Sequence, residues 1–363
     1  MRMEELVGHR RPTALLQRSL LNGRVSNAYL FVGEEGIGKT LAAIAFGRAL
    51  VCENPDARPE HGIYEACGHC RSCLLSAAGN HPDLRVIAPE GERIRIDQMR
   101  DLRHEVSLTA FGGARRAYII QHAEAMTEES ANCILKTLEE PPPGVTLILV
   151  TESLSQLLPT ILSRCQIVRF RPAAPGAIEA LLVERHHVPA AHARFIASIS
   201  GGRAGWAVRA AQQPAILDVR ERLMHLLARL PEADPVFVFR AAEEIRDMAV
   251  ALADAGTPEP SAGEAVSASG ASSEDRQIRA NADAVLDIAR AWFRDLLVLK
   301  MASEMPLINV DRRGELETAA ERTPLPRIHK ALDALSHTRY YLARNANVSL
   351  ALEVMMARLV VGG

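Results

Sequence analysis

The stretch Gly33–Thr40, which reads GEEGIGKT, constrains the fold of this chain more than any other segment. Its spacing, G-x-x-x-x-G-K-T, lets backbone N–H groups turn toward a phosphate at the N-terminus of the following helix. The apolar run Asn27–Gly33 leads into it, and the alanine-rich segment Leu41–Val51 follows it. A strand, a glycine loop and a helix in this order predict a P-loop within an α/β domain. A chance glycine-rich turn is the alternative.

The residues of this loop predict a nucleotide site. Gly33, Gly36 and Gly38 are expected to line the phosphates with backbone N–H groups. The Lys39 ammonium is expected to reach the β- and γ-phosphates, and the Thr40 hydroxyl to hold Mg²⁺. Only four of the 42 Lys and Arg residues are lysine, so a lysine at the position that requires a compact charge is informative. The expected ligand is ATP or ADP with Mg²⁺.

Apolar segments alternate with a helical pattern beyond the loop. The predicted strands are Ala117–Ile120, Val145–Val150 and Ile167–Phe170. Between the first two, Glu128–Glu140 has apolar residues on one helical face and is stopped by Pro141–Pro143, which cannot continue a helix. Strands that alternate with helices predict a parallel sheet covered on both faces.

The residues just after the predicted strand Ala117–Ile120 bear on catalysis. A hydrolysing P-loop enzyme needs an aspartate there for Mg²⁺, usually with a glutamate that activates water. This chain has Gln121 and His122 instead, and neither serves as an ionised carboxylate ligand and general base. Glu124, three positions after Gln121, is the alternative carboxylate. We therefore expect nucleotide binding without turnover, and intrinsic ATPase activity is expected to be absent; a P-loop ATPase that acts on its own is the alternative.

Four cysteines have the spacing of a metal site. Cys67, Cys70 and Cys73 form C-x-x-C-x-x-C, and Cys52 stands upstream at the end of the P-loop helix. Four thiolates satisfy tetrahedral Zn²⁺ and leave no open position, so the site is expected to be structural. Iron–sulfur ligation, disulfides and plain buried thiols are the alternatives.

Charge and hydropathy argue against three classes of protein: one that binds nucleic acid through the charge of the whole chain, a zinc finger that reads DNA bases, and a membrane protein. The formal net charge of −2 argues against a whole-chain electrostatic grip on nucleic acid. Leu74–Asn80, just after the cysteines, has no positive charge, which disfavours a zinc finger that reads DNA bases. No segment approaches the roughly 18 uninterrupted apolar residues of a membrane span, and no signal peptide is evident. A cytoplasmic protein without a membrane partner is expected.

Strand signals cease after Pro172, and the remaining chain is helical in pattern. We predict an α/β domain at residues 1–171 with a cysteine module at about 52–80, a small helical domain at 172–212, and an all-helical domain at 213–363.

Two details of the last domain are predicted as well. A segment at about residues 256–275, rich in Pro, Gly, Ser and Ala, is expected to be a disordered loop. The last helix, about Val348–Val361, has Leu350, Val354 and Ala357 on one stripe, which is expected to pack against neighbouring helices.

Two segments carry a resemblance to a known family: ILKTLEEPPPGVTLILVTES, residues 134–153, and LPTILSRCQIVRF, residues 158–170. They resemble the clamp-loader subunits of bacterial replicative DNA polymerase, members of the AAA+ ATPase superfamily. In that family the Ser-Arg-Cys triplet, here Ser163–Cys165, carries an arginine finger that reaches ATP bound to the adjacent subunit. The resemblance implies that Arg164 acts in trans, where a planar, always-charged guanidinium suits a transferring phosphoryl group. A surface arginine without that role is the alternative.

Within the family, the residues are most similar to the delta-prime type rather than the ATP-hydrolysing gamma/tau type, which is the alternative. The cysteine module with its following segment, Ala66–Gly91, favours this. So do the degenerate motif at Gln121 and His122 and the segment ARNANVSLALEVMMARL, Ala343–Leu359, which is similar to the delta-prime collar helix. The resemblance implies a largely non-hydrolysing stator, with residues 172–212 as a lid and 213–363 as an oligomerising collar.

The same resemblance implies partners and sensor residues. The implied partners are gamma/tau and delta subunits, with the sliding clamp and primer-template DNA in the complex. Sensor 1 maps to Thr151, and a one-residue shift maps it to Glu152. Sensor 2 is an arginine of the lid in many members, whereas Trp206 stands near that position here. Arg203 or Arg209 is the substitute that the sequence offers.

Overall fold

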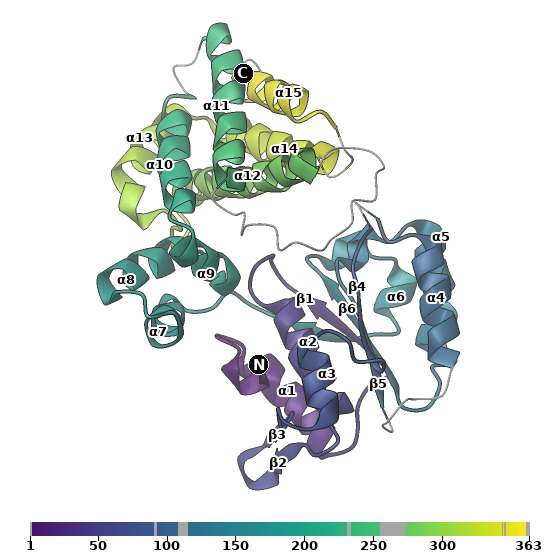
Figure 1. The fold of residues 1–363 in the computed structure, drawn as a ribbon. Helices are drawn as coiled ribbons and strands as arrows, with labels where there is room; N and C mark the ends of the chain where they lie inside the picture. The colour runs from purple at the N-terminus through teal and green to yellow at the C-terminus, as the bar shows by residue number, and fades with distance from the viewer. Residues whose placement is uncertain are drawn as a thin grey trace. The chain divides into compact units, whose positions relative to one another are not determined.

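The structure is a computed structural model that describes residues 2–90, 93–107, 115–230, 234–254, 273–342, 344 and 346–360 (Figure 1). Internal contacts divide the chain into two compact units. The first comprises Met1–Leu181 with Gly202–Trp206, and the second comprises Leu182–Gly201 with Ala207–Gly363. The three-domain division expected from the sequence stays a prediction.

A five-stranded sheet forms the centre of the first unit. Its strands are β1 (Ala28–Val32), β4 (Leu84–Ile87), β5 (Arg116–Ile120), β6 (Val145–Thr151) and β7 (Gln166–Arg169). The spatial order is β4-β5-β6-β1-β7, and every neighbouring pair is parallel. The predicted parallel α/β sheet is confirmed, and the three strands predicted beyond the loop match to within one residue at each end.

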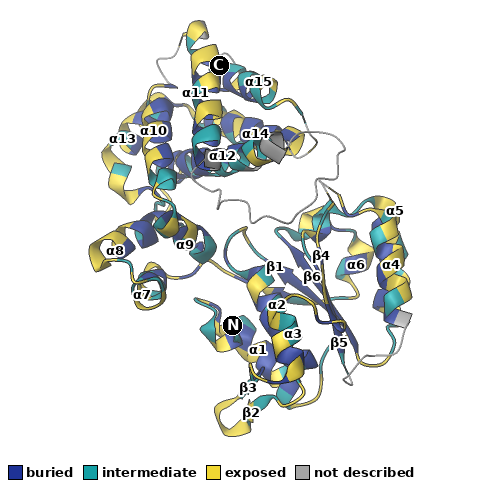
Figure 2. Ribbon diagram, in the orientation of Figure 1, coloured by how far each residue is buried: buried dark blue, intermediate teal, exposed yellow. Residues whose placement is uncertain are grey.

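Apolar residues alternate between the two faces of this sheet. Phe31 belongs to the core shared with α2 (Lys39–Val51). Its neighbour Leu30 belongs to the core shared with α4 (Ile96–Ser107) and α5 (Glu128–Glu139). Successive strand residues point to opposite faces, so a strand covered on both faces reads as an unbroken apolar run. Figure 2 shows the central strands in dark blue, with exposed residues on the outer sides of the helices.

Shorter elements complete the first unit. Those before β4 are η1 (Met3–Glu5), α1 (Arg10–Leu21), β2 (Asp56–Arg58), η2 (Pro59–His61), β3 (Ile63–Glu65) and α3 (Arg71–Ala77). Those after β5 are η3 (Ala123–Ala125), η4 (Leu154–Gln156) and α6 (Pro159–Leu162). Strands β2 and β3 pair antiparallel in a hairpin that leads into the cysteine turn. Helix α5 ends one residue earlier than predicted, ahead of the three prolines.

The buried carboxylate of Glu65, at the end of β3, ties the hairpin to the N-terminal segment. It accepts the backbone N–H of Met3 at 2.9 Å and that of Glu4 at 3.0 Å. It also accepts the side-chain amide of Gln17, on α1, at 2.7 Å. Burial raises the pKa of Glu65, and these hydrogen bonds act in the opposite direction. The hairpin, α1 and η1 therefore share one polar anchor inside the fold.

In its described residues, the second unit contains helices and no strand. Its elements are α8 (Ala190–Ile199), α10 (Ala215–Ala228), α11 (Pro235–Asp254), α12 (Ser273–Lys300), η6 (Val310–Arg312), α13 (Arg313–Arg322), α14 (Leu325–Leu342) and α15 (Val348–Val360). Helices α7 (Pro175–His186) and α9 (Ala204–Gln212) are divided between the two units. The apolar core surrounds Trp292 of α12. None of the helices described is long and apolar enough to cross a membrane.

Two predictions about the second unit concern the loop at residues 256–275 and the inner face of the last helix. The expected disordered loop at 256–275 lies outside the described residues up to 272, and residues 273–275 are helical, in the first turn of α12. The predicted inner stripe of the last helix is wrong, because Leu350 and Val354 are exposed. The buried stripe of α15 consists of Leu352, Met355, Met356 and Leu359. This helix is apolar on most sides, so periodicity alone could not select the inner face.

Candidate functional site

The predicted P-loop joins β1 to the N-terminus of α2. Gly38 is the residue before the helix, and its φ of 105° lies in the left-handed region. Gly36 has a φ of 75°. Residues with a β-carbon rarely adopt such angles, which explains a glycine at each position. The first N–H groups of a helix have no partner within it, so the loop presents donors that suit a phosphate.

The side chain of Lys39 lies within this loop. It is 7% exposed, and its Nζ donates to the backbone carbonyls of Gly33 at 2.6 Å and Glu34 at 2.7 Å. Burial lowers the pKa of Lys39, while nearby carboxylates, those of Glu152 and Glu124 foremost, act to raise it. A phosphate at this position would compete with two carbonyls of the loop for the ammonium.

Two residues that sequence reasoning missed hold the loop from outside. The Nε2 of buried His9 lies 2.6 Å from the Ile37 carbonyl; because a carbonyl only accepts, Nε2 carries the proton. The His9 Nδ1 is buried without a hydrogen-bond partner in the described structure. On another side, the Gly205 N–H donates to the Gly36 carbonyl at 2.9 Å. Neither contact has a signal in the local sequence, because both partners are distant along the chain.

Acidic groups gather opposite the loop, where the sequence has Gln121 and His122. The ligand atoms of His122, Glu124 and Glu152 lie within 4.8 Å of one another, an arrangement that can hold a cation. The hydrogen bond with Glu124 raises the pKa of His122. Burial acts to raise the pKa of Glu124, but its hydrogen bonds with His122, with its own backbone N–H and with Thr151, together with the charge of His122, outweigh burial, and the net shift of the pKa is downward. The alternative carboxylate of the sequence therefore stands near Lys39, together with Glu152.

The sensor candidates have separate surroundings. Thr151 ends β6, is buried, and donates its hydroxyl to a carbonyl two residues on at 3.1 Å. Arg203 is buried, and its guanidinium lies 5.8 Å from the ring centre of Trp206. A β-carbon on Gly36 would lie 3.7 Å from that of Arg203. Arg203 is thus beside the P-loop, whereas Arg209 is exposed on α9.

The guanidinium of Arg164 lies at the surface just after α6. The side chain is 33% exposed and forms an ion pair with Glu139, to which its Nε donates at 2.8 Å. One terminal nitrogen donates to the Thr160 carbonyl at 2.9 Å and to the Ser163 hydroxyl at 3.1 Å. The planar group is held in one orientation by its own chain, and all three of its nitrogens have partners there, while the side chain stays partly exposed to solvent.

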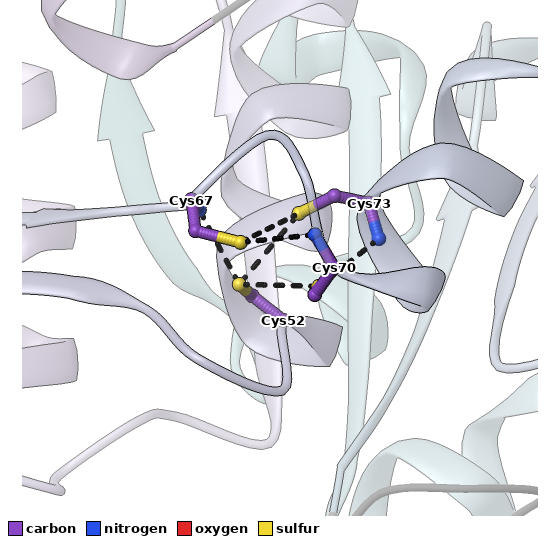
Figure 3. A group of neighbouring side chains, drawn as sticks. All are labelled: Cys52, Cys67, Cys70 and Cys73. Carbon is purple, nitrogen blue, oxygen red and sulfur yellow. Dashed lines mark hydrogen bonds between the residues drawn. The ribbon is translucent and has the colours of Figure 1, made fainter.

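The four predicted cysteine ligands come together in space. Figure 3 shows the side chains of Cys52, Cys67, Cys70 and Cys73 converging from the end of α2, from the turn before α3 and from the first turn of α3. The Cys52 sulfur lies 3.8 Å from that of Cys70 and 3.6 Å from that of Cys73. The sulfurs of Cys67 and Cys73 are 3.9 Å apart. None of the four is in a disulfide. Bonds of about 2.3 Å to a tetrahedral zinc ion place sulfurs about 3.8 Å apart, so the spacing fits.

Backbone N–H groups orient these sulfurs. The N–H of Cys67 points to the Cys52 sulfur, that of Cys70 to Cys67, and that of Cys73 to Cys70, each at 3.3 Å. Burial acts to raise the pKa of Cys67, but hydrogen bonds from the backbone N–H groups of His69 and Cys70 and with the thiols of Cys70 and Cys52 together lower it to about 7, whereas burial raises the pKa of Cys52 and of Cys73. The four sulfurs lie within 4.8 Å of one another, so this cluster can hold a metal ion, to which the cysteines would bind as thiolates. All four positions come from protein, which leaves no ligand site for catalysis.

Comparison with known proteins gives the family. A profile described as "DNA polymerase III, delta subunit" matches residues 8–174, and one described as "DNA polymerase III, delta subunit, C terminal" matches residues 277–360. The chain is 37% identical over 228 residues to DNA polymerase III subunit delta' of Pseudomonas aeruginosa, covering 60% of this chain and 68% of that protein. The chain belongs to the DNA polymerase III delta-prime family.

Two further relatives of this delta-prime family member each match about half of the chain. It is 41% identical over 175 residues to DNA polymerase III subunit delta' of Bacillus subtilis, covering 48% of this chain and 51% of the relative. The chain therefore spans about half the length of that relative. It is 34% identical over 177 residues to DNA polymerase III subunit tau of the same organism, covering 49% of this chain and 30% of the tau protein.

Proposed function

We propose that this delta-prime family member is a clamp-loader subunit of the replicative DNA polymerase holoenzyme. It acts as a largely non-hydrolysing stator and supplies Arg164 in trans to ATP held by a neighbouring gamma/tau subunit. The reaction served is the loading of the sliding clamp onto primed DNA. The delta' and tau names of its relatives support this assignment.

The observation that carries the proposal is the state of Arg164. Its guanidinium is oriented by a single carboxylate, Glu139, and by two oxygens of its own α6 segment, yet it remains partly open to solvent. A group that is oriented and accessible suits a phosphoryl group carried by another chain. Dependence of hydrolysis on a trans arginine makes ATP turnover depend on assembly.

The test uses the reconstituted clamp loader. Trans arginines contribute about 10³-fold or more to phosphoryl transfer, so Arg164→Ala should lower turnover at the adjoining ATP site by about that factor. Arg169→Ala is the matched control, because Arg169 is also an exposed arginine and lies five residues further on. Undiminished turnover in Arg164→Ala complexes with intact assembly would contradict the role.

A second candidate function follows from Glu124 and Glu152. Their carboxylates stand near Lys39, where a chain that hydrolyses its own ATP keeps a metal ligand and a general base. We expect no turnover by the isolated chain, because Glu124 is engaged with His122. Steady-state ATPase of the isolated chain decides this. Turnover that disappears in Glu124→Gln and survives in the exposed control Glu129→Gln would establish the second candidate instead.

The four cysteines bind Zn²⁺ as a structural ion in this proposal. The sulfur spacing and the N–H groups directed at sulfur support it. Iron–sulfur ligation is the rival that the same thiolates allow. Metal analysis together with visible absorption separates the two, because Zn²⁺ is colourless. One zinc per chain without visible absorption is the expected result.

The remaining assignments rest on the same proposal. Residues 1–171 bind ATP or ADP with Mg²⁺ through Gly33–Thr40, with Thr151 as sensor 1 and Arg203 in the place of sensor 2. Residues 172–212 form the lid, and 213–363 form the collar that joins gamma/tau and delta subunits in the cytoplasm. Size analysis of mixtures with each subunit tests the collar assignment.

A further inference from the structure

A hollow of about 410 Å³ lies between α1 and the first residue of β7. Three arginines border it, Arg11, Arg18 and Arg24, and the neutral hydrogen-bonding groups of Ser19, Asn22 and Gln166 stand between them. We call this set the arginine hollow. Neither Lys39, nor Arg164, nor any cysteine lines it, so it is separate from the sites described above.

The three guanidinium groups have no acidic partner of their own. All three side chains are exposed, and within the described chain none forms an ion pair or a side-chain hydrogen bond. No carboxylate lines the hollow. Elsewhere arginines pair with acids, as Arg220 does with Asp311 and Arg339 with Asp283. Three unpaired guanidinium groups around one hollow therefore select an anion as ligand.

The spacing of the charges indicates an extended ligand. Arg11 and Arg18 are seven residues apart on α1, which corresponds to about 10 Å along a helix, and Arg24 lies beyond the helix end. A nucleic-acid strand carries one charge per about 3.4 Å of axis, so four successive phosphates span about 10 Å, the distance from Arg11 to Arg18. The charges of a single free phosphate are much closer together.

The chemistry of the lining favours a nucleic-acid backbone over an acidic protein. Arginine, serine, asparagine and glutamine are side chains that contact phosphate oxygens in protein–DNA complexes. A protein interface needs an apolar core, whereas only two of the eight residues that line the hollow, Ala14 and Leu15, are apolar. We propose that the arginine hollow binds the phosphodiester backbone of DNA. This deepens the proposed function by naming a contact for the primed DNA.

The test measures binding of a fluorescent primer-template DNA to the full chain by anisotropy. In the triple variant Arg11→Ala, Arg18→Ala, Arg24→Ala we expect the Kd to rise by about 10-fold or more. The salt dependence should also fall, because each lost phosphate contact removes about 0.7 to 0.9 from the slope of log K against log salt. Alanine favours helix and these side chains are exposed, so the variant should fold, as thermal unfolding will check.

A charge-matched control isolates the site. Arg222→Ala, Arg240→Ala, Arg246→Ala removes the same charge from exposed positions of α10 and α11 and should leave DNA affinity within about 2-fold. Equal weakening by both triples, or no DNA binding by the unaltered chain, would overturn the proposal. The proposal would also be overturned if poly-glutamate displaced the fluorescent DNA as effectively as an unlabelled oligonucleotide of the same charge. Arg164 is intact in both triples, so these outcomes are independent of the trans-arginine test.

Discussion

The two ends of α2 solve the same problem, the placement of charged groups, in opposite ways. At its N-terminus Lys39 points its ammonium into carbonyls of its own loop. At its C-terminus Cys52 directs its sulfur to three others, and backbone N–H groups already point at the sulfurs. At the cysteine end the sulfurs already have the spacing of metal ligands. At the loop end the Lys39 ammonium is hydrogen-bonded to carbonyls of the loop. Preorganisation of a site is therefore a property of each end and not of the helix.

The largest expected effect is at the cysteine end. Cys70→Ser removes one buried ligand, and loss of a structural metal is among the few changes that destabilise by more than about 4 kcal/mol. Zinc content and thermal unfolding measure this. Cys133→Ser is the control, since Cys133 is a half-buried cysteine outside the cluster. If the two variants unfold alike and retain equal zinc, the cysteine end is not a metal site.

The next effect is at the loop end. Lys39→Ala should weaken binding of ATP with Mg²⁺ to the isolated chain by roughly 10²-fold, because charge-assisted hydrogen bonds to phosphate contribute about 1.5 to 3 kcal/mol. Calorimetric titration gives the affinities. Lys136→Ala changes an exposed lysine of α5 and should bind as the unaltered chain does. Equal affinities for both variants would mean that the loop does not use its lysine for phosphate.

The smallest effect concerns His9, which holds the loop through the Ile37 carbonyl. Burial lowers the pKa of His9 below its ordinary value of 6.5, and its hydrogen bond to Ile37 opposes this only in part. The unfolded chain therefore takes up the proton first as pH falls. The stability that neutral His9 contributes is complete above pH 6.5 and is lost progressively below it.

Removing this imidazole tests the pH dependence. Between about pH 7.5 and about pH 5.5, His9→Gln should lose less stability than the unaltered chain, by about 1 kcal/mol. Chemical unfolding at the two pH values measures the difference, and His192→Gln, at an exposed position of α8, should behave as the unaltered chain. A larger pH dependence in His9→Gln would show that the protonated form is the one stabilised.

Local patterns predicted the parallel sheet, the P-loop and the cysteine cluster. Each is a short-range signal: an apolar run, a glycine spacing, or cysteines close in sequence that can meet in one turn. Helix α5 was predicted to within one residue because the prolines after it cannot continue a helix.

Contacts between distant residues were not predictable. Nothing near His9 in the sequence indicates Ile37, and nothing near Arg164 selects Glu139 as its partner. The hairpin β2–β3 was also missed, since its strands have three residues each and little apolar pattern. Helix α15 has two apolar stripes, and the spacing of apolar residues in the sequence fits either of them as the buried face. Only the packing of the surrounding helices determines which one is buried.

The anchor at Glu65 has a consequence for how the chain is made. Met3 and Glu65 are 62 positions apart, and synthesis proceeds from the N-terminus. When η1 leaves the ribosome, its acceptor has not been translated, so the amides of Met3 and Glu4 face water. The earliest part of the first unit to be synthesised therefore gains these hydrogen bonds only after the hairpin β2–β3 has been synthesised.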